Sequence, residues 1–315
     1  GIEEIKFSDG VTWSLNDIFN NTRADGTSSA ETLLGTGRRD YIRGLAGNDT
    51  IWADVGNDTL DGGSGNDSLA GQVGNDTYLW RTGDGNDTIN DGSSSGAETD
   101  TLRLQDVTSD DVTLRRINGS NDLLVEVNGQ SSTITIVNQY YSTDDVGYGI
   151  EAIEFADGEI WGREDLFART KLWGLYGADN LSGTARMDVI LGMQGNDTIN
   201  ALAGNDLLVG MTGDDLVKGG AGSDTYSWSK GDGNDTIDDQ VESEAGGLDA
   251  DILQLSDVLT NEVSLTRQVG TSNPHDLFIT ITPTGEVIRV INRFHPDNLS
   301  YVPNSRGIEA IHFMD

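Results

Sequence analysis

Residues 44–70 read GLAGNDTIW-ADVGNDTLD-GGSGNDSLA, three copies of a nine-residue unit laid end to end. Each copy begins with Gly or Ala, carries Gly-Asn-Asp at its fourth to sixth positions, and has an apolar residue at its eighth. Self-similarity at a fixed period is typical of repeat proteins, in which each unit is one small structural element stacked on its neighbours. This stretch therefore predicts a solenoid.

The nine-residue step continues on both sides of this stretch, over residues 26–79, and the same phase returns over residues 174–227. In both arrays the sixth position is acidic and the eighth is apolar or aromatic. Twelve units in one register make chance a poor explanation. The sixth positions are Glu31, Asp40, Asp49, Asp58, Asp67 and Asp76 in the first array, and Asp179, Asp188, Asp197, Asp206, Asp215 and Asp224 in the second.

A longer period places the two arrays in two modules, because Gly174 repeats Gly26 at an offset of 148 residues and Asp235 repeats Asp87. The phrase GIEEIKFSDG at residue 1 returns as GIEAIEFADG at residue 149 and as GIEAIHFMD at residue 307. We therefore expect a piece of a longer tandem array. Its parts are the tail of a preceding module (1–25), a first module (26–170, with nonapeptides 26–79 and flank 80–170), and a second module (171–315, with nonapeptides 174–227 and flank 228–315).

Local chemistry divides each unit into a turn and a strand. Gly permits positive φ and close backbone approach, which favours a turn over the first six residues. Triplets such as TIW and SLA suit a pleated surface, with the eighth side chain pointing inward. Two units would make one coil, with strands on two faces and turns along two edges. The sequence therefore predicts an all-β chain of two tandem parallel β-rolls, each a β-solenoid of Gly/Asp-rich nonapeptides.

The period changes after each array. TLRL at residues 101–104, DLLVEV at 122–127 and HDLFITI at 275–281 alternate in twos, which predicts strands. Because the open ends of a solenoid must be covered, we expect these flanking strand regions to cap the rolls. GREDLFAR, residues 162–169, indicates a short helix.

The charge balance points to cations as partners. The chain carries 19 Lys+Arg against 53 Asp+Glu, a formal charge of -34. That balance argues against nucleic acid, whose phosphates need basic partners, and against an anionic membrane surface. No apolar run is long enough for a transmembrane segment. A compact fold with this charge would repel itself, and because the chain has no Cys, metal ions are the expected cross-links.

Calcium is the metal that this arrangement predicts. Every second turn of a roll lies on the same edge, so Asp49 stacks beside Asp67, and Asp58 stacks beside Asp40 and Asp76. Stacked carboxylates repel one another unless a cation lies between them. Ca2+ takes six to eight oxygens and accepts both carboxylates and backbone carbonyls. A Gly-rich turn with an Asp at its sixth position supplies both.

The unit GGSGNDSLA resembles the calcium-binding nonapeptide of RTX (repeats-in-toxin) proteins. Residues 121–161 also resemble the segment that follows such repeats in haemolysin-type proteins. The resemblance implies that one turn gives the carbonyls of its first and third residues, that the next turn on that edge gives those of its second and fourth, and that Asp from both turns completes the shell. For the turns at Gly44 and Gly62 the implied ligands are Gly44, Ala46, Asp49, Gly63, Gly65 and Asp67.

The same reasoning predicts several Ca2+ ions in each module. GDGNDTI, at residues 83–89 and 231–237, indicates one more ligand turn in a shifted phase. Arg38 and Arg186 replace the fourth-position Gly, and Glu31 replaces Asp, so these edges are expected to bind weakly or not at all. The candidate ligands are Asp40, Gly44, Ala46, Asp49, Asp58, Gly62, Gly63, Gly65, Asp67, Gly71, Gly74, Asp76, Asp84, Asp87, Asp179, Asp188, Gly192, Gly195, Asp197, Gly204, Asp206, Gly210, Gly213, Asp215, Gly219, Gly220, Gly222, Asp224, Asp232 and Asp235.

The resemblance implies a calcium-binding module of a larger secreted bacterial protein, which folds on calcium outside the cell and supports type I secretion. It would be extracellular or lie on the bacterial surface. Its partners would be calcium, neighbouring modules and the secretion machinery used by the full-length protein. The alternative is an adhesive or polysaccharide-binding module of an RTX adhesin or polysaccharide-modifying enzyme. A glycan array with and without calcium separates these hypotheses.

We expect no active site in this chain. It contains no His-Glu-x-x-His zinc motif, and calcium ligation explains its paired carboxylates better than acid–base catalysis does. Any catalytic domain would lie outside this sequence. Tyr78, Trp80, Tyr226 and Trp228 are candidates for a sugar-stacking platform, but we expect them to plug the end of each narrow roll.

Overall fold

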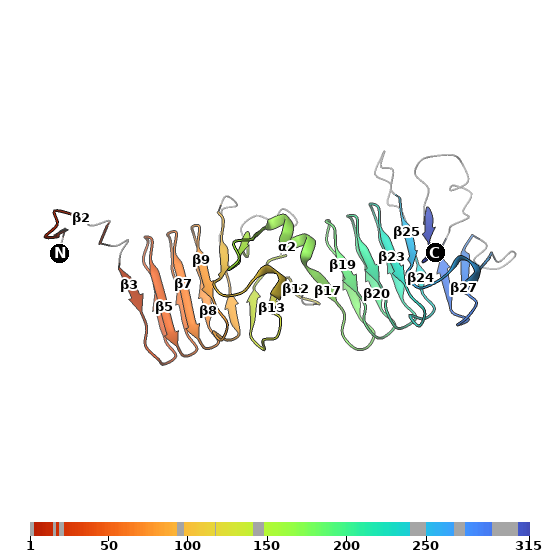
Figure 1. Ribbon diagram of the computed structural model, residues 1–315, viewed down its shortest axis with the longest axis horizontal. Helices are drawn as coiled ribbons and strands as arrows, with labels where there is room; N and C mark the ends of the chain where they lie inside the picture. The colour runs from red at the N-terminus through yellow and green to blue at the C-terminus, as the bar shows by residue number, and fades with distance from the viewer. Residues whose placement is uncertain are drawn as a thin grey trace. The chain divides into compact units, whose positions relative to one another are not determined.

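The computed structural model describes residues 3–14, 17–18, 22–92, 98–116, 118–140, 148–239, 250–267, 275–291 and 308–315. The chain divides into two compact units, Gly1–Arg169 and Thr170–Asp315. The described residues of both units are mostly short strands joined by tight turns (Figure 1).

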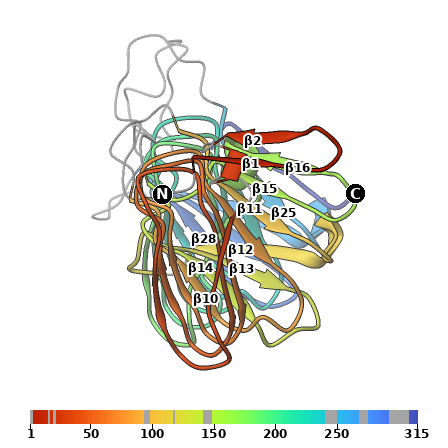
Figure 2. The ribbon, with the colours of Figure 1, turned by 90° about the vertical axis from the view of Figure 1, so that its left-hand side faces the viewer.

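In the first unit the nonapeptides wind into a parallel β-roll. Successive strands alternate between two sheets, with the orders β3-β5-β7-β9-β11 and β4-β6-β8-β10. Ile51 pairs with both Leu33 and Leu69 in parallel register, so two units make one coil, as predicted. Figure 2, seen from the N-terminal side, shows the coils lying behind one another. The strands are β3 (Arg23–Asp25), β4 (Thr32–Leu34), β5 (Tyr41–Ala46), β6 (Thr50–Trp52), β7 (Thr59–Ser64), β8 (Ser68–Ala70), β9 (Thr77–Trp80), β10 (Asp87–Ile89) and β11 (Thr101–Leu104).

The second unit repeats this winding. Its sheets have the orders β17-β19-β21-β23-β25 and β18-β20-β22-β24, again with parallel pairs. The strands are β17 (Lys171–Trp173), β18 (Asn180–Ser182), β19 (Val189–Leu191), β20 (Thr198–Asn200), β21 (Leu207–Val209), β22 (Leu216–Lys218), β23 (Thr225–Trp228), β24 (Thr236–Ile237) and β25 (Ile252–Leu255).

The flanks extend both sheets of each roll, so they cap it as the sequence predicts. In the first unit, β14 pairs in parallel with β10 and continues into an antiparallel β12-β13-β14 meander, while β15 pairs with β11 and with β16. The expected short helix follows as α2. In the second unit, β28 pairs with β24 and β29 pairs with β25. These elements are β12 (Val112–Arg116), β13 (Leu123–Val127), β14 (Thr133–Ile136), β15 (Ala152–Glu154), β16 (Ile160–Gly162), α2 (Arg163–Arg169), β26 (Val263–Thr266), β27 (Leu277–Ile281), β28 (Val287–Val290) and β29 (Ala310–His312).

The remaining elements named here are short. β1 (Glu4–Lys6) and β2 (Thr12–Ser14) pair as an antiparallel hairpin near the N-terminus. Single 3-10 turns, Ser109–Asp111 and Thr260–Glu262, precede the first meander strand of each flank.

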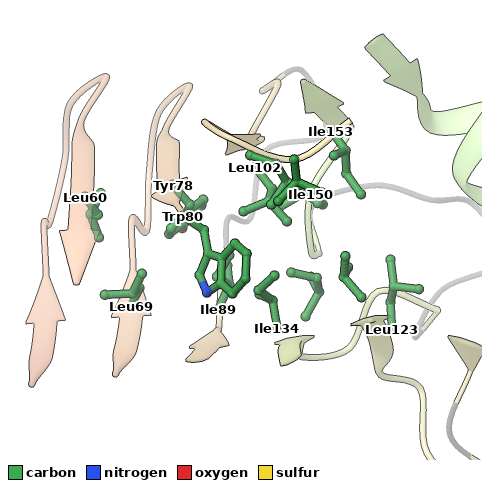
Figure 3. Packing of buried hydrophobic residues seen from close by; sticks show 14 of the residues in the cluster. Leu60, Leu69, Tyr78, Trp80, Ile89, Leu102, Leu123, Ile134, Ile150 and Ile153 are labelled. Carbon is green, nitrogen blue, oxygen red and sulfur yellow. The ribbon is translucent and has the colours of Figure 1, made fainter. Parts of the chain in front are cut away.

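The eighth side chain of each interior unit points into its roll. From Ile42 to Tyr78 these side chains are at most 2% exposed. Figure 3 shows Leu60 in one row of side chains with Leu102 and Ile153, and Leu69 in a facing row with Ile134 and Leu123, so one core runs through roll and flank. Burying each aliphatic side chain of this kind contributes about 1.5–3 kcal/mol.

The aromatic residues at the ends of the arrays belong to the same cores. Tyr78 and Trp80 are at most 2% exposed, and Tyr226 and Trp228 are at most 3% exposed. Side chains this deeply buried cannot stack on a sugar. Their burial confirms a place in the core, which continues from each roll into its flank.

Candidate calcium sites

The nonapeptide turn depends on backbone conformations that favour glycine. At the fourth position, Gly65 has φ +146°, and a methyl group there would overlap the carbonyl oxygen of Gly47 in the preceding turn on that edge. The second position is also left-handed, and there the chain places Leu45 and Met211 at φ 77° and 64°. A bulky residue in this conformation costs about 1–3 kcal/mol, which the surrounding structure must offset.

Stacked turns are joined by a ladder of aspartates. The backbone N–H of Asp49 donates to Oδ1 of Asp67 over 2.7 Å. On the other edge, Asp40 donates to Asp58 and Asp58 donates to Asp76 in the same way, each over 2.7 Å. The predicted stacking of Asp49 beside Asp67, and of Asp58 beside Asp40 and Asp76, is confirmed. The second unit contains the same ladders at 2.7–2.8 Å, with donor–acceptor pairs Asp179–Asp197, Asp197–Asp215, Asp188–Asp206 and Asp206–Asp224.

The other oxygen of each interior aspartate is the strongest sign of a cation site. It is buried, and within the described residues no hydrogen-bond donor reaches it. Each parent side chain is at most 2% exposed. A buried carboxylate oxygen without a partner is costly, and a cation beside it removes that cost. The atoms are Oδ2 of Asp49, Asp58, Asp67, Asp76, Asp197, Asp206 and Asp215.

Where the first position of the unit is glycine, the Oδ2 atom of the aspartate in the same unit lies against the backbone of that glycine. A methyl group on Gly62 would overlap Oδ2 of Asp67, and one on Gly210 would overlap Oδ2 of Asp215. Glycine at these positions therefore leaves the space that the carboxylate occupies. The Oδ2 atoms without a donor consequently lie within the Gly-rich turns, among backbone carbonyls of the kind that Ca2+ accepts as ligands.

The carbonyls between two stacked turns have a defined direction. The carbonyl oxygens of Leu45 and Gly47 lie against Gly63 and Gly65, while that of Gly62 lies against Gly44. The second- and fourth-position carbonyls of the earlier turn thus face the later turn, whereas the resemblance implied first- and third-position ligands, Gly44 and Ala46, from the earlier turn. The choice of carbonyl ligands stays a prediction, and Leu45 and Gly47 join the candidates.

Burial makes several of the aspartates difficult to ionise without a cation. It raises the pKa of Asp67 to about 6, that of Asp76 to about 7 and that of Asp235 to about 8. In each case loss of hydration outweighs the backbone hydrogen bond, which lowers the pKa. The charges of neighbouring carboxylates raise the pKa further. A bound cation would lower these pKa values, because its charge opposes both the loss of hydration and the repulsion from neighbouring carboxylates.

The shifted-phase turns contribute one ladder residue each. The backbone N–H of Asp67 donates to Oδ1 of Asp87 over 2.8 Å, and that of Asp215 donates to Oδ1 of Asp235 over 2.9 Å. Asp84 is placed differently, because its Oδ2 accepts the backbone N–H of Arg81 at 2.8 Å. Asp232 likewise accepts the backbone N–H of Ser229 at 2.7 Å. These two aspartates cap their own turns and lie outside the ladders.

The first turns of each array also differ from the interior ones. The second carboxylate oxygen of Asp40 accepts the backbone N–H of Thr36 at 2.6 Å, and that of Asp188 accepts the N–H of Thr184 at 2.6 Å. Glu31 accepts the N–H of Thr27 at 2.7 Å. In these first turns, backbone N–H groups therefore donate to the carboxylate oxygens whose counterparts in the described interior turns have no donor. This geometry favours the prediction of weak binding at the first coil.

The ladders continue past the nonapeptides, which the sequence reasoning missed. Oδ1 of Asp100 accepts the backbone N–H of Asp76 at 2.8 Å, and the N–H of Asp100 in turn donates to Oε2 of Glu151 at 2.6 Å. In the second unit, Asp251 and Glu309 take these places. A signal was present, since Asp100-Thr-Leu copies the Asp-Thr-Leu of the units, but it follows a loop rather than a nine-residue step.

Two buried groups of three carboxylates lie at these points, Asp76 with Asp91 and Asp100, and Asp224 with Asp239 and Asp251. In each group one oxygen from each side chain lies within 4.8 Å of the others. Burial, and then the neighbouring carboxyl group, raises the pKa of both Asp100 and Asp251 to about 9.

Comparisons with known proteins agree with this geometry. The model of the RTX calcium-binding nonapeptide repeat matches residues 25–60, 51–78, 173–208 and 202–227. The model of the haemolysin-type calcium binding protein related domain matches residues 122–165. A comparison with curated protein sequences found no match.

Two solved structures are similar to parts of the chain. The AlgE6R3 subunit of the Azotobacter vinelandii mannuronan C5-epimerase is 23% identical, with a TM-score of 0.29, over 38% of this chain and 72% of that one. The extracellular lipase LipA of Serratia marcescens is 16% identical, with a TM-score of 0.30, over 91% of this chain and 40% of that one. The family models and the Asp ladders identify two arrays of RTX calcium-binding nonapeptide repeats in this chain, with a haemolysin-type calcium binding protein related domain after the first array, and these repeats bind Ca2+.

Proposed function

We propose that this chain is a calcium-triggered folding module of a larger secreted protein. The observation that supports this most directly is the set of buried carboxylate oxygens that have no partner among the described residues. They sit in ladders whose neighbouring aspartates are 18 residues apart. A fold built around unpaired buried charge is unstable until a cation is bound.

Each ion would lie between two turns on one edge, held by pairs such as Asp49 with Asp67 and Asp197 with Asp215. Bound calcium supplies positive charge and accepts lone pairs from the oxygens around it. The aspartates both bind and orient, because one oxygen of each fixes the preceding turn through its backbone N–H. Ligand binding and turn stacking are thus properties of the same side chain.

The calcium concentration decides by mass action whether the chain folds. Where calcium is scarce, mutual repulsion among the 53 acidic residues opposes the compact state. Where calcium is abundant, binding energy becomes folding energy. Extracellular calcium modules have Kd values of about 10⁻⁴–10⁻³ M. We therefore propose that the chain stays unfolded and exportable by a type I secretion channel inside the cell, and folds outside it.

Within the described residues, the structure contains no helix of the length and apolar character needed to cross a membrane. The ladders place their carboxylates in a structural role, so we assign the chain no catalytic function of its own.

The test is circular dichroism of the full chain in chelator and in millimolar calcium. We expect a largely disordered spectrum in chelator and a β-rich one in calcium. Magnesium at the same concentration should substitute poorly, because it requires a smaller octahedral shell and dehydrates reluctantly. Identical spectra in chelator and calcium would overturn the proposal.

A further inference from the structure

The point where the first roll meets its flank carries a different arrangement from the nonapeptide turns. Asp76 precedes β9, Asp91 follows β10 and Asp100 precedes β11. Their side chains are at most 2% exposed, and one oxygen from each lies within 4.8 Å of the others. Three carboxylates from three segments thus share one buried space.

Each of these carboxylates is held in place by donors. Oδ1 of Asp91 accepts the hydroxyl of Tyr78 at 2.7 Å and the backbone N–H of Gln72 at 3.0 Å. Tyr78 is itself oriented, because its oxygen accepts the backbone N–H of Gly71 at 2.8 Å. The group is therefore preorganised by contacts that leave further carboxylate oxygens for a ligand.

Buried carboxylate oxygens without a donor point to that ligand. Oδ2 of Asp76 is buried, and no donor in the described part of the chain reaches it. In the second unit, Oδ2 of Asp239 is buried and likewise has no donor among the described residues, while Oδ1 accepts the hydroxyl of Tyr226 at 2.9 Å. The same arrangement thus occurs in both units, although the loops that lead to it differ in sequence.

The backbone of the same residues holds the flank. The carbonyl of Asp100 accepts the N–H groups of Glu151 and Ala152 at 2.8 and 3.1 Å, and the carbonyl of Asp91 accepts the N–H of Gly149 at 3.2 Å. In the second unit, the carbonyl of Asp251 accepts the N–H groups of Glu309 and Ala310 at 2.9 and 3.2 Å, at the start of β29. A ligand that fixes these carboxylates also fixes the attachment points of the flank.

We propose that Asp76, Asp91 and Asp100 form a calcium site that locks the flank onto the roll, and that Asp224, Asp239 and Asp251 form its counterpart. Calcium fits because every ligand is a hard oxygen and because a cation relieves the repulsion among three carboxylates gathered in a buried site. The site differs from the nonapeptide sites in taking a carboxylate, Asp91, from outside the two stacked turns. This proposal rests on the calcium-dependent folding proposed above.

The test uses the full chain carrying Asp91→Asn and Asp239→Asn together, with the exposed Asp110→Asn as control. Bound calcium is counted by elemental analysis after dialysis against millimolar calcium, and amide exchange is followed in parallel. We expect the double variant to bind two ions fewer than the wild type. Amides of residues 150–154 should exchange at least tenfold faster, while those of residues 42–60 stay protected. The control should match the wild type in both measurements.

Equal ion counts for the double variant and the wild type would overturn the inference while leaving calcium-dependent folding intact. A wild-type chain that binds no calcium would instead overturn the proposed function. Should the double variant not fold, Tyr78→Phe with Tyr226→Phe keeps every carboxylate and removes the hydroxyls that orient two of them. Calorimetry should then show two ions bound at least fivefold more weakly. Unchanged affinities for all ions would overturn the inference.

Discussion

Asp67 offers the sharpest test of the ladder. Its Oδ1 accepts the backbone N–H of Asp49 at 2.7 Å, and its buried Oδ2 has no donor among the described residues. Asp67→Ala removes both oxygens, whereas Asp67→Asn keeps an oxygen that can accept the N–H but loses the charge. Comparing the two variants therefore separates the structural hydrogen bond from calcium ligation.

The expected loss of stability follows from the backbone N–H of Asp49, which loses its acceptor. Because Asp49 is 2% exposed, its N–H in Asp67→Ala has no access to water, and an unsatisfied buried donor costs about 1–3 kcal/mol. Asp67→Ala should therefore be about 1–3 kcal/mol less stable than Asp67→Asn at the same calcium concentration, with the cavity left by the side chain adding to this difference. Both variants should require more calcium than the wild type, since each loses a carboxylate ligand.

Glu31→Ala is the matched control. Glu31 occupies the same position of the first unit, but its carboxylate hydrogen bonds only to Thr27 among the described contacts, and that contact is exposed. Its removal leaves water to satisfy the donors, so the change should stay within about 0.5 kcal/mol. Urea unfolding in saturating calcium gives the free energies, and calcium titration followed by circular dichroism gives the midpoints. Equal losses for Glu31→Ala and Asp67→Ala would refute the assigned register.

Three further outcomes are expected. Burial raises the pKa of Asp76 from 3.8 to about 7, so in calcium-free buffer the fold is favoured below pH 4 and loses this stability as the pH rises through 7; circular dichroism that does not change with pH would contradict this. A fragment covering residues 26–169 should fold on calcium, whereas one that stops at Asn90 should fold poorly because its end is uncapped; equal titration midpoints and amplitudes would remove the flank from the mechanism. Gly65→Ala should lose at least about 1 kcal/mol because its φ is +146°, while Gly37→Ala, which has open space around it, should change little; similar urea midpoints would contradict the assigned turn.

Much of the fold could be predicted because the repeat is local. The nine-residue period places Ile51 between Leu33 and Leu69, and the structure pairs these three residues in parallel register. The same period predicts that Asp49 stacks beside Asp67, which the 2.7 Å hydrogen bond confirms. Such predictions succeed where neighbours in space are a constant number of residues apart.

Prediction was incomplete where local contacts compete with the ladder. Asp84 and Asp87 stand in one Gly-rich turn, and the sequence makes both of them candidate ligands. Only the structure shows that Asp87 joins the ladder while the carboxylate of Asp84 accepts the N–H of Arg81. The repeat pattern does not reveal this contact between residues three apart, because it shows only that both residues are Asp in a Gly-rich turn.

The sequence by itself determined the parallel roll, its two-unit coil, its acidic edges and its calcium chemistry, because each of these depends on residues at fixed spacing. Only the tertiary structure decided that Asp91 and Asp100 lie beside Asp76, that their backbone carries the flank, and which carbonyls face the neighbouring turn. Asp76 and Asp100 are 24 residues apart, and Asp100 and Glu151 are 51 apart. No period links these separations, so such contacts arise only when the sheets of the roll and the strands of its flank pair and bring distant segments together.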